Sequence, residues 1–350
     1  MLLEPIYERE FCDFSYGFRP GRSAHQALKA IWQGINRTQT AWVVDVDIRA
    51  FFDTLDHQVL MGILQKRVKD GVILKLVAKW LKAGVMEAGA LSYPEAGTPQ
   101  GGVISPILSN IYLHGSPTHR PPLFPSAASE VLDEWFEAAV MPRLKGRGFM
   151  VRYADDFVMG FECREDAERV MNALPGRFGR YGLKLHEGKT RPFRQAQGPE
   201  PAEGLVRFGR PGAGPGGESG SGKPETFDFL GFNHHWAKSR KGRWFVQRKT
   251  ARKRLSRALK TIHGWCRKNR HRPLEELLPE LGRKLRGHYA YYGIMCNYRS
   301  LAKFYEGATR GMQWWLNRRS RQEDGMSWER FKTLIRQVYP LPKPRIVHSV

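Results

Sequence analysis

The chain is poor in cysteine, and it has no long apolar run. Its 350 residues include Cys12, Cys163, Cys266 and Cys296, which are widely spaced and form no CxxC pair. We therefore expect neither a zinc knuckle nor a disulfide framework, and a reducing cytoplasm fits this cysteine use. No stretch approaches the roughly 18 apolar residues that span a bilayer. The first residues, MLLEPIYERE, lack the basic segment and apolar core of a signal peptide. We expect a cytoplasmic protein.

Acidic residues are also scarce, and their scarcity is local. The chain has 34 Asp and Glu against 57 Lys and Arg, a net charge of +23. From Lys238 to Arg321 there are 24 Lys or Arg, 4 Glu and no Asp, so this segment carries +20 and the rest only +3. A large positive charge attracts polyanions, and the usual polyanion is nucleic acid. Because one segment carries nearly the whole excess, we interpret it as a binding surface.

Hydrophobic periodicity outlines the secondary structure. Apolar residues at helical spacing predict helices at 24–35, 57–81, 103–113, 130–144 and 164–181, followed by basic helices after Gln247. Alternating and β-branched residues predict strands at 41–48, 183–190 and 227–232, with a hairpin of 150–152 and 157–161. A Pro-rich loop is expected at 115–125. Segment 195–225 is rich in Gly, Pro, Ser and Glu, which predicts a flexible insertion with no core of its own.

Three aspartates occupy positions suited to metal binding. Asp47 lies at the end of the strand 41–48, and Asp155 and Asp156 lie at the tip of the hairpin. Each motif alone is more often a solvated turn or a strand beside the core. Together, in this order, they favour nucleotidyl transfer, which uses two divalent cations on carboxylates. Strand ends and hairpin tips hold such ligands rigidly.

Other polar residues near these aspartates have simpler interpretations. Asp45 is interpreted as a secondary polar neighbour, and Asp53 as a helix N-cap because TLDHQVL follows it. Asp56 and His57 fit a cap and a first helical turn. The segment GTPQGGVISPILSN (97–110) could be a tight turn before a buried helix, but that leaves its polar PQG unexplained. Its glycines let a ligand approach the backbone, and Gln100 offers donors and an acceptor.

Six segments together resemble one family. They are SYGFRPGRSAHQAL (15–28), VDIRAFFDTLDH (46–57), GTPQGGVISPILSNIYLH (97–114), RYADDF (152–157), GLKLHEGKT (182–190) and FDFLGF (227–232). In this order they resemble the reverse transcriptases encoded by bacterial group II introns. The resemblance implies an α+β right-hand polymerase palm, an antiparallel sheet with packed helices, followed by an α-helical thumb/maturase domain. The implied activity is RNA-directed DNA polymerase, with a maturase role in binding intron RNA and assisting splicing.

The same resemblance implies roles for individual residues. Asp47, Asp155 and Asp156 would hold two Mg²⁺ ions, with Mn²⁺ a possible substitute and the Ile48 carbonyl an extra ligand. Phe52, rather than Phe51, would exclude a ribose 2′-hydroxyl. The further implied positions are Gln100, Gly101 and Lys189 at the dNTP and template, Phe229, Leu230 and Gly231 in the primer grip, and Arg248, Lys249, Arg252, Lys253, Arg254, Arg257 and Lys260 on RNA. We interpret the aromatic residues Tyr289, Tyr291, Tyr292, Trp314 and Trp315 as core anchors rather than RNA-stacking platforms.

The resemblance also divides the chain into domains. The expected parts are partial fingers and palm entry at 1–40, the palm at 41–236, a basic thumb/maturase domain at 237–321, and a C-terminal tail at 322–350. The family's first two finger blocks and an HNH nuclease are not matched. Two rivals stay open: a non-catalytic RNA-binding splicing cofactor, and a host-adapted reverse transcriptase of a defence or repair system. The implied gate at Phe52 makes an RNA-dependent RNA polymerase the least favoured.

Overall fold

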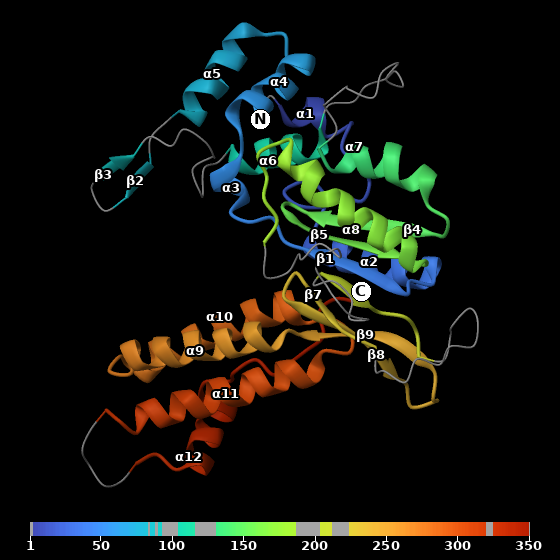
Figure 1. Cartoon of the computed structure of the whole chain (residues 1–350). Helices are drawn as coiled ribbons and strands as arrows, with labels where there is room; N and C mark the ends of the chain where they lie inside the picture. The colour runs from blue at the N-terminus through green and yellow to red at the C-terminus, as the bar shows by residue number, and fades with distance from the viewer. Residues whose placement is uncertain are drawn as a thin grey trace. The chain divides into compact units, whose positions relative to one another are not determined.

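The chain folds as two compact units, Met1–Leu230 and Gly231–Val350, in a computed structural model (Figure 1). The residues that the structure describes are 3–82, 85–87, 90–92, 104–115, 131–186, 204–211, 224–319 and 325–349. Each unit has its own hydrophobic core. Among the helices in these ranges, none combines the length and apolarity needed to cross a membrane.

The first unit mixes helices with short strands. Its helices are α1 (Glu4–Tyr7), α2 (Ala24–Thr38), α3 (Phe51–Thr54), α4 (His57–Arg67), α5 (Gly71–Leu81), α6 (Ser105–His114), α7 (Asp133–Trp135), the π turn η1 (Phe136–Val140), the 3-10 turn η2 (Met141–Arg143) and α8 (Arg164–Gly179). Its strands are β1 (Trp42–Val46), β2 (Val85–Glu87), β3 (Ala90–Ser92), β4 (Gly148–Tyr153), β5 (Asp156–Phe161), β6 (Leu205–Arg207) and β7 (Phe227–Phe229).

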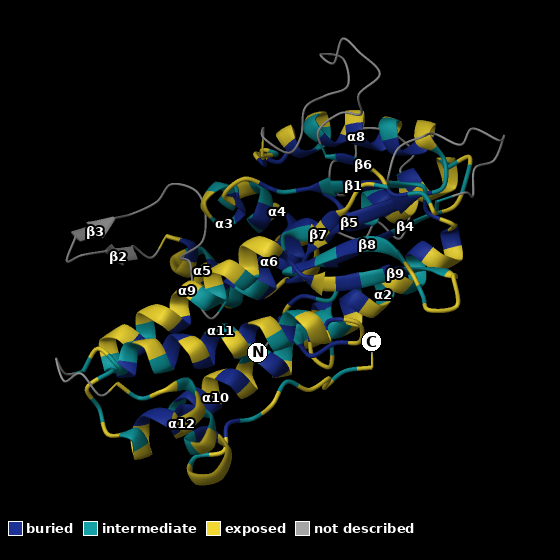
Figure 2. Cartoon of the chain, turned by 90° about the horizontal axis from the view of Figure 1, so that it is seen from below, coloured by how far each residue is buried: buried dark blue, intermediate teal, exposed yellow. Residues whose placement is uncertain are grey.

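The central sheet of this unit has the strand order β4-β5-β1-β6, and each of its described neighbours pairs antiparallel. Successive side chains of a strand face opposite sides. On β1, Val44 and Val46 belong to the main core, whereas Val43 faces the other side. Helix α8 packs on the core side, and α2 packs on the opposite side against β4 (Figures 1 and 2). Helices therefore pack on both faces of the antiparallel sheet, and the predicted α+β fold is confirmed.

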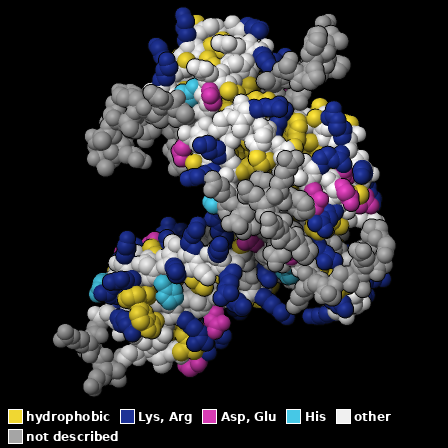
Figure 3. Space-filling model, viewed as in Figure 1, with side chains coloured by type: hydrophobic (Ala, Val, Ile, Leu, Met, Phe, Trp, Pro, Cys, Tyr) yellow, Lys and Arg dark blue, Asp and Glu magenta, His cyan; other side chains and the backbone are white. Residues whose placement is uncertain are grey.

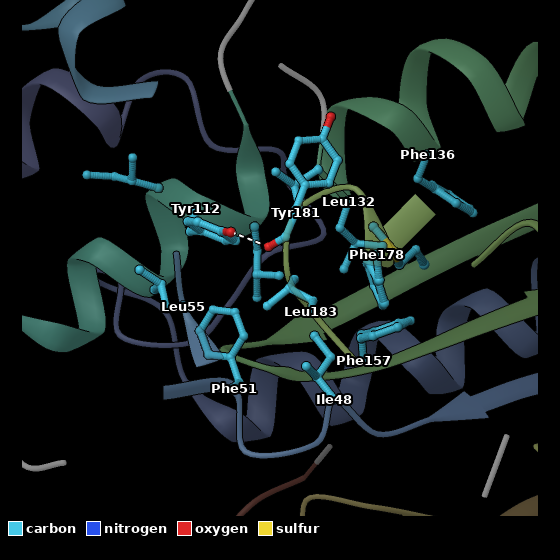
Figure 4. Close-up of a cluster of buried hydrophobic side chains, with 14 of the residues drawn as sticks. Ile48, Phe51, Leu55, Tyr112, Leu132, Phe136, Phe157, Phe178, Tyr181 and Leu183 are labelled. Atoms are coloured by element: carbon cyan, nitrogen blue, oxygen red, sulfur yellow. Dashed lines mark hydrogen bonds between the residues drawn. The ribbon is translucent and has the colours of Figure 1, made fainter. Parts of the chain in front are cut away.

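The core under α8 combines aliphatic and aromatic side chains (Figure 4). Phe51, Phe157 and Phe178 are buried within it, and the rings of Phe157 and Phe178 meet edge to face with centroids 6.1 Å apart. The hydroxyl of Tyr112 in α6 donates a 2.5 Å hydrogen bond to the carbonyl of Tyr181. This bond satisfies a polar group that would otherwise be costly inside the core.

Two helix predictions need correction. The segment 57–81 forms two helices, because the Asp70 carboxylate accepts hydrogen bonds from the amides of Val72 and Ile73 and starts α5. The helical spacing of apolar residues continues from one helix to the next because both helices bury apolar residues. The pattern therefore predicted a single helix. Asp53 is not an N-cap, since it lies inside α3. Asp56 caps α4 instead, and accepts bonds from two amides at 2.7 and 3.1 Å.

Two further predictions fail around β6. Within the predicted strand 183–190, the described residues 183–186 form only an isolated bridge between Leu185 and Ile48. The prediction that 195–225 is a flexible insertion without a core is wrong for residues 204–208. There, β6 pairs with β1, and Leu205 and Phe208 are buried. The segment LVRF is short, and the Gly and Pro residues around it led to the prediction of a flexible insertion.

The second unit is a hairpin followed by helices. Its elements are β8 (Phe232–Lys238), β9 (Trp244–Thr250), α9 (Arg252–Asn269), α10 (Leu274–Tyr292), α11 (Tyr298–Leu316), α12 (Trp328–Thr333) and the π turn η4 (Leu334–Val338). Helices α9, α10 and α11 are amphipathic, with buried stripes facing one another (Figure 2). Gly307 and Gly311 of α11 allow close packing, because a Cβ at either would come within 2.6 Å of Leu259 or His263 of α9. The predicted tail contributes Phe331 and Ile335 to this core.

Candidate active site and nucleic-acid surface

The three predicted acids lie at one end of the central sheet. The register pairs Val46 of β1 with Phe157 of β5, so its next step sets Asp47 beside Asp156. Paired residues of antiparallel strands project on the same face, which is also the face of Asp45 and its partner Val158. Asp155 follows Ala154 in the two-residue turn between β4 and β5. All three acids are half-buried.

Electrostatics links the strand end to the turn. Burial raises the pKa of Asp155, the Asp47 carboxylate raises it further, and the Arg152 guanidinium opposes both. A divalent cation would stabilise the charged form of a carboxylate that lies beside another carboxylate. In the described ranges, however, no three Asp, Glu, His or Cys side chains gather as a ready-made metal cluster. The acids are adjacent on the sheet, but they do not form a closed cage.

The bridge at Ile48 sets the direction of its carbonyl oxygen. The Asp47 carbonyl accepts from the amide of His186, and the amide of Arg49 donates to the carbonyl of Lys184. In an antiparallel bridge, the residue between two such bonds directs its own carbonyl the opposite way. The Ile48 carbonyl therefore faces away from Lys184 and His186, while its side chain is buried. This orientation leaves the oxygen suited to binding a ligand.

The two phenylalanines after β1 have different environments. Phe51 is 2% exposed and forms part of the core, whereas Phe52 is half-buried and packs on its edge. Their rings meet at 76° with centroids 5.4 Å apart. Ala50, which precedes them, has a left-handed φ of 47° and begins α3. Of the two rings, that of Phe52 is the more accessible.

Several predicted contacts are only partly visible. Gln100, Gly101 and Lys189 lie outside the described residues. In the predicted primer grip, Phe229 is buried, and the chain turns at Leu230 and Gly231 with φ values of 49° and 80°. These positive φ values form a tight reversal just after β7.

The basic surface lies mainly on α9. Its exposed residues include Arg252, Lys253, Arg254, Arg257 and Lys260. The opposite face of α9 packs Leu255 and Leu259 into the core. In Figure 3, dark-blue side chains gather over the part of the second unit that α9 and α10 occupy in Figure 1.

Two predictions about this unit need correction. Arg248 is buried, and burial lowers the pKa of its guanidinium, so it is not part of the exposed face. Trp314 is 43% exposed rather than a core anchor, and the Arg318 guanidinium lies 3.3 Å from its ring centroid. By contrast, Tyr289 is buried, and Trp315 packs against the core.

One buried group beside the acids was not singled out from the sequence. Arg152 and Asp133 form a fully buried ion pair under the hairpin, with Asn110 hydrogen-bonded to the same guanidinium. Arg152 and Asn110 belong to segments that resemble the family, but the sequence suggested no role for either. Asp133 comes from a helix with no distinguishing motif, so only the fold could pair it.

An antiparallel sheet with acids at a strand end and a hairpin tip, followed by a basic helical unit, is the architecture of a nucleic-acid polymerase. A model of reverse transcriptases (RNA-dependent DNA polymerases) matches residues 1–234. The chain belongs to the reverse transcriptase family. A second model, of the group II intron maturase-specific domain, matches residues 255–334.

Individual proteins are similar to parts or all of this chain. Protein YkfC of Escherichia coli is 35% identical over 212 residues, which cover 55% of this chain and 54% of that protein. Group II intron-encoded protein LtrA of Lactococcus lactis is 46% identical over 114 residues, 33% of this chain and 19% of that protein. The structure of telomerase from Candida albicans with a telomeric RNA fragment covers 99% of this chain and 58% of that one, at 14% identity and a TM-score of 0.43. The matched parts thus span about half or less of the two curated relatives.

Proposed function

We propose that this chain is an RNA-directed DNA polymerase of a group II intron, which extends a DNA primer with dNTPs on an RNA template. We also propose that its basic helical unit binds the intron RNA and assists splicing. The observation that carries the polymerase proposal is the placement of Asp47 beside Asp156 at the end of the sheet, with Asp155 in the adjoining turn. Membership of the reverse transcriptase family supports it.

The acids fit a divalent cation site. Carboxylate oxygens are the ligands that Mg²⁺ prefers, and the repulsion between Asp47 and Asp155 is what a cation would relieve. Two bound Mg²⁺ ions, or Mn²⁺ in their place, would activate the primer 3′-hydroxyl and neutralise charge on the triphosphate. Asp47, Asp155 and Asp156 would hold them, with the Ile48 carbonyl as a further ligand.

The chain's own residues would orient the reactants. The primer 3′-hydroxyl attacks the α-phosphate of the dNTP, the bond to the β-phosphate breaks, and pyrophosphate leaves. The strand end and the hairpin tip would keep the acids fixed beside the reacting phosphate. The half-buried ring of Phe52 would contact the sugar and exclude a 2′-hydroxyl.

The basic surface of α9 would bind RNA through its phosphates. The exposed Arg and Lys side chains offer positive charge along one face of the helix. Such contacts release counterions, so binding should weaken steeply as salt rises. The match to the maturase-specific domain supports intron RNA as the partner.

Primer extension tests the polymerase proposal. With an RNA template, a DNA primer, dNTPs and Mg²⁺, the full chain should extend the primer, and Asp155→Asn should lower the rate at least about a hundredfold. Asp70→Asn is the matched control, because Asn also caps a helix well and Asp70 lies in the α5 cap. Extension that persists in both Asp155→Asn and Asp47→Asn would contradict the assigned site.

The two rival functions predict different results. A non-catalytic splicing cofactor would bind intron RNA tightly and show no extension by the unaltered chain. A host-adapted reverse transcriptase would extend primers without preferring intron RNA over an unrelated structured RNA. The proposal requires both extension and that preference.

A further inference from the structure

The buried ion pair beneath the hairpin reaches the turn that carries Asp155. Arg152 lies in β4 with no exposed surface. Its guanidinium donates to both carboxylate oxygens of Asp133, at 2.7 and 2.5 Å, and to the Asn110 Oδ1 at 2.9 Å. The nitrogen that binds Asn110 also donates to the carbonyl of Ala154, at 2.9 Å. Arg152 is therefore bonded to the residue that precedes Asp155.

The partners of Arg152 are themselves fixed. Asp133 is fully buried, and although burial alone would raise its pKa, Arg152 and His114 hold that pKa below its usual value. Asn110 lies in the buried helix α6, and its Nδ2 donates a 2.7 Å bond to the carbonyl of Gly17. The guanidinium is thus hydrogen-bonded to two side chains from helices outside the hairpin.

A loop from the start of the chain closes the other side of β4. The Arg152 amide donates to the Phe14 carbonyl, and the Tyr16 amide donates to the Arg152 carbonyl, both at 2.8 Å. A Cβ at Gly17 would lie 2.3 Å from the backbone nitrogen of Ala154, so only glycine fits there. The SYG motif of residues 15–17 therefore packs directly against the turn.

Ala154 needs this support. Its φ of 59° is left-handed, a backbone conformation that is unfavourable for a residue with a Cβ. A turn in such a conformation persists when its surroundings determine it. A buried ion pair is weak evidence for stability, because desolvation offsets much of the attraction. If the ion pair served stability alone, Arg152 would not need its hydrogen bond to the Ala154 carbonyl.

We propose that Arg152 is a positioning residue: through the Ala154 carbonyl it fixes the turn, and so directs the Asp155 carboxylate toward Asp47 for divalent cation binding. Asp133 and Asn110 hold the guanidinium in place for this task. The inference rests on the proposed function only in taking Asp155 as a cation ligand. Groups that orient a metal ligand typically change metal affinity about 10- to 100-fold when they are removed.

The test is Mn²⁺ binding by the full chain without nucleic acid, followed by electron paramagnetic resonance, with a thermal melt of each variant. The double variant Arg152→Met with Asp133→Leu leaves no unpaired buried charge, so it should fold. It should bind Mn²⁺ about 10- to 100-fold more weakly. Asn110→Ala should weaken binding in the same direction while the ion pair stays intact. Arg152→Lys with Asp133 unchanged should recover part of the loss, because a single ammonium can still meet some of these acceptors.

Asp166→Asn is the matched control. Asp166 is another buried carboxylate, and it accepts bonds from the amides of Lys145 and Gly146 and from Arg169, away from the turn. The Asp166→Asn variant should have a lower melting temperature than the unaltered chain. Its Mn²⁺ affinity should stay within about twofold of that of the unaltered chain, as expected for a residue that affects stability alone.

The outcomes separate the two proposals. Unchanged Mn²⁺ affinity in the folded double variant and in Asn110→Ala overturns the positioning role, whatever the melting temperatures. Normal Mn²⁺ binding by the unaltered chain without primer extension contradicts the polymerase and leaves the positioning role to be judged by the variants. If the unaltered chain does not bind Mn²⁺, both proposals fail.

Discussion

The two units use charged residues in opposite ways. Residues 1–230 contain 28 Lys and Arg against 27 Asp and Glu, a net of +1, whereas residues 231–350 contain 29 against 7, a net of +22. In the first unit, Arg152 with Asp133 and Arg19 with Glu8 are ion pairs whose guanidinium is almost fully buried. In the second unit, none of the ion pairs among the described residues is buried in this way, and Arg310 with Glu306 is fully at the surface. Balanced, buried charge fixes geometry, and excess exposed charge is available to phosphates.

The largest expected effect tests the excess charge of the second unit. Replacing Arg252, Lys253, Arg257 and Lys260 with Gln should lower RNA affinity about a hundredfold near physiological salt. The slope of log affinity against log salt should fall by roughly 3, because each lost phosphate contact removes close to one released counterion. Gln is a good helix former, so α9 should persist. Filter binding or fluorescence anisotropy over a salt series measures both quantities.

The first unit supplies the matched control. Lys75, Lys79 and Lys82 are also exposed and helical or at a helix end, on or next to α5. Their replacement with Gln removes three charges from the nearly neutral unit and should leave the salt slope nearly unchanged. An equal loss of RNA affinity in the two sets of variants would mean that RNA binding depends on net charge alone. The contrast between the units would then disappear.

A smaller effect is expected at the sugar gate of the first unit. Phe52→Val should lower the preference for dNTPs over rNTPs by roughly 10- to 100-fold, because the ring is proposed to meet the 2′-hydroxyl. Phe51→Val is the companion variant, since it should destabilise the core and leave sugar preference unchanged. Single-nucleotide incorporation kinetics with each substrate gives the ratio. A change of preference in Phe51→Val alone would reverse the assignment.

The features that the sequence predicted well are local. The strand ending at Asp47 and the hairpin tip at Asp155 follow from alternation within a few residues, and the structure contains both. The basic helix expected after Gln247 is also a local feature, and the structure contains α9 there. Each of these patterns is complete within one segment, so it needs no knowledge of a distant partner.

The features that could not be predicted from the sequence depend on contacts with residues in other segments of the chain. Asp133 pairs with Arg152, which lies in a different element, and Gly17 contacts the turn from 137 positions before Ala154. Strand β6 is only three residues long, and it is recognisable once β1 lies beside it. The burial of Arg248 likewise comes from packing that the basic sequence around it does not reveal. Tertiary contacts decided each of these cases.

The smallest expected effect concerns how the two units respond to pH. Burial lowers the pKa of His288 in α10 to about 4, and its ring stacks on Phe304 with centroids 3.6 Å apart. Between about pH 6.5 and 4, the unfolded chain binds a proton here that the folded chain excludes, so stability should fall as the pH drops through this window. Asp155 acts oppositely: its raised pKa means that the fold gains stability as this carboxyl takes up a proton.

The His288 effect can be isolated by difference. From pH 7 to pH 5, His288 should contribute a loss on the order of 1–2 kcal/mol to the stability of the second unit. Phe fits a stacked site, so His288→Phe should remove that part of the loss, whereas replacing the exposed His271 with Phe should not. Hydrogen exchange of the α10 amides in the full chain at pH 7 and pH 5 measures this loss of stability. If His288→Phe and the unaltered chain lose protection equally, burial of this ring does not set the acid sensitivity of the helical unit.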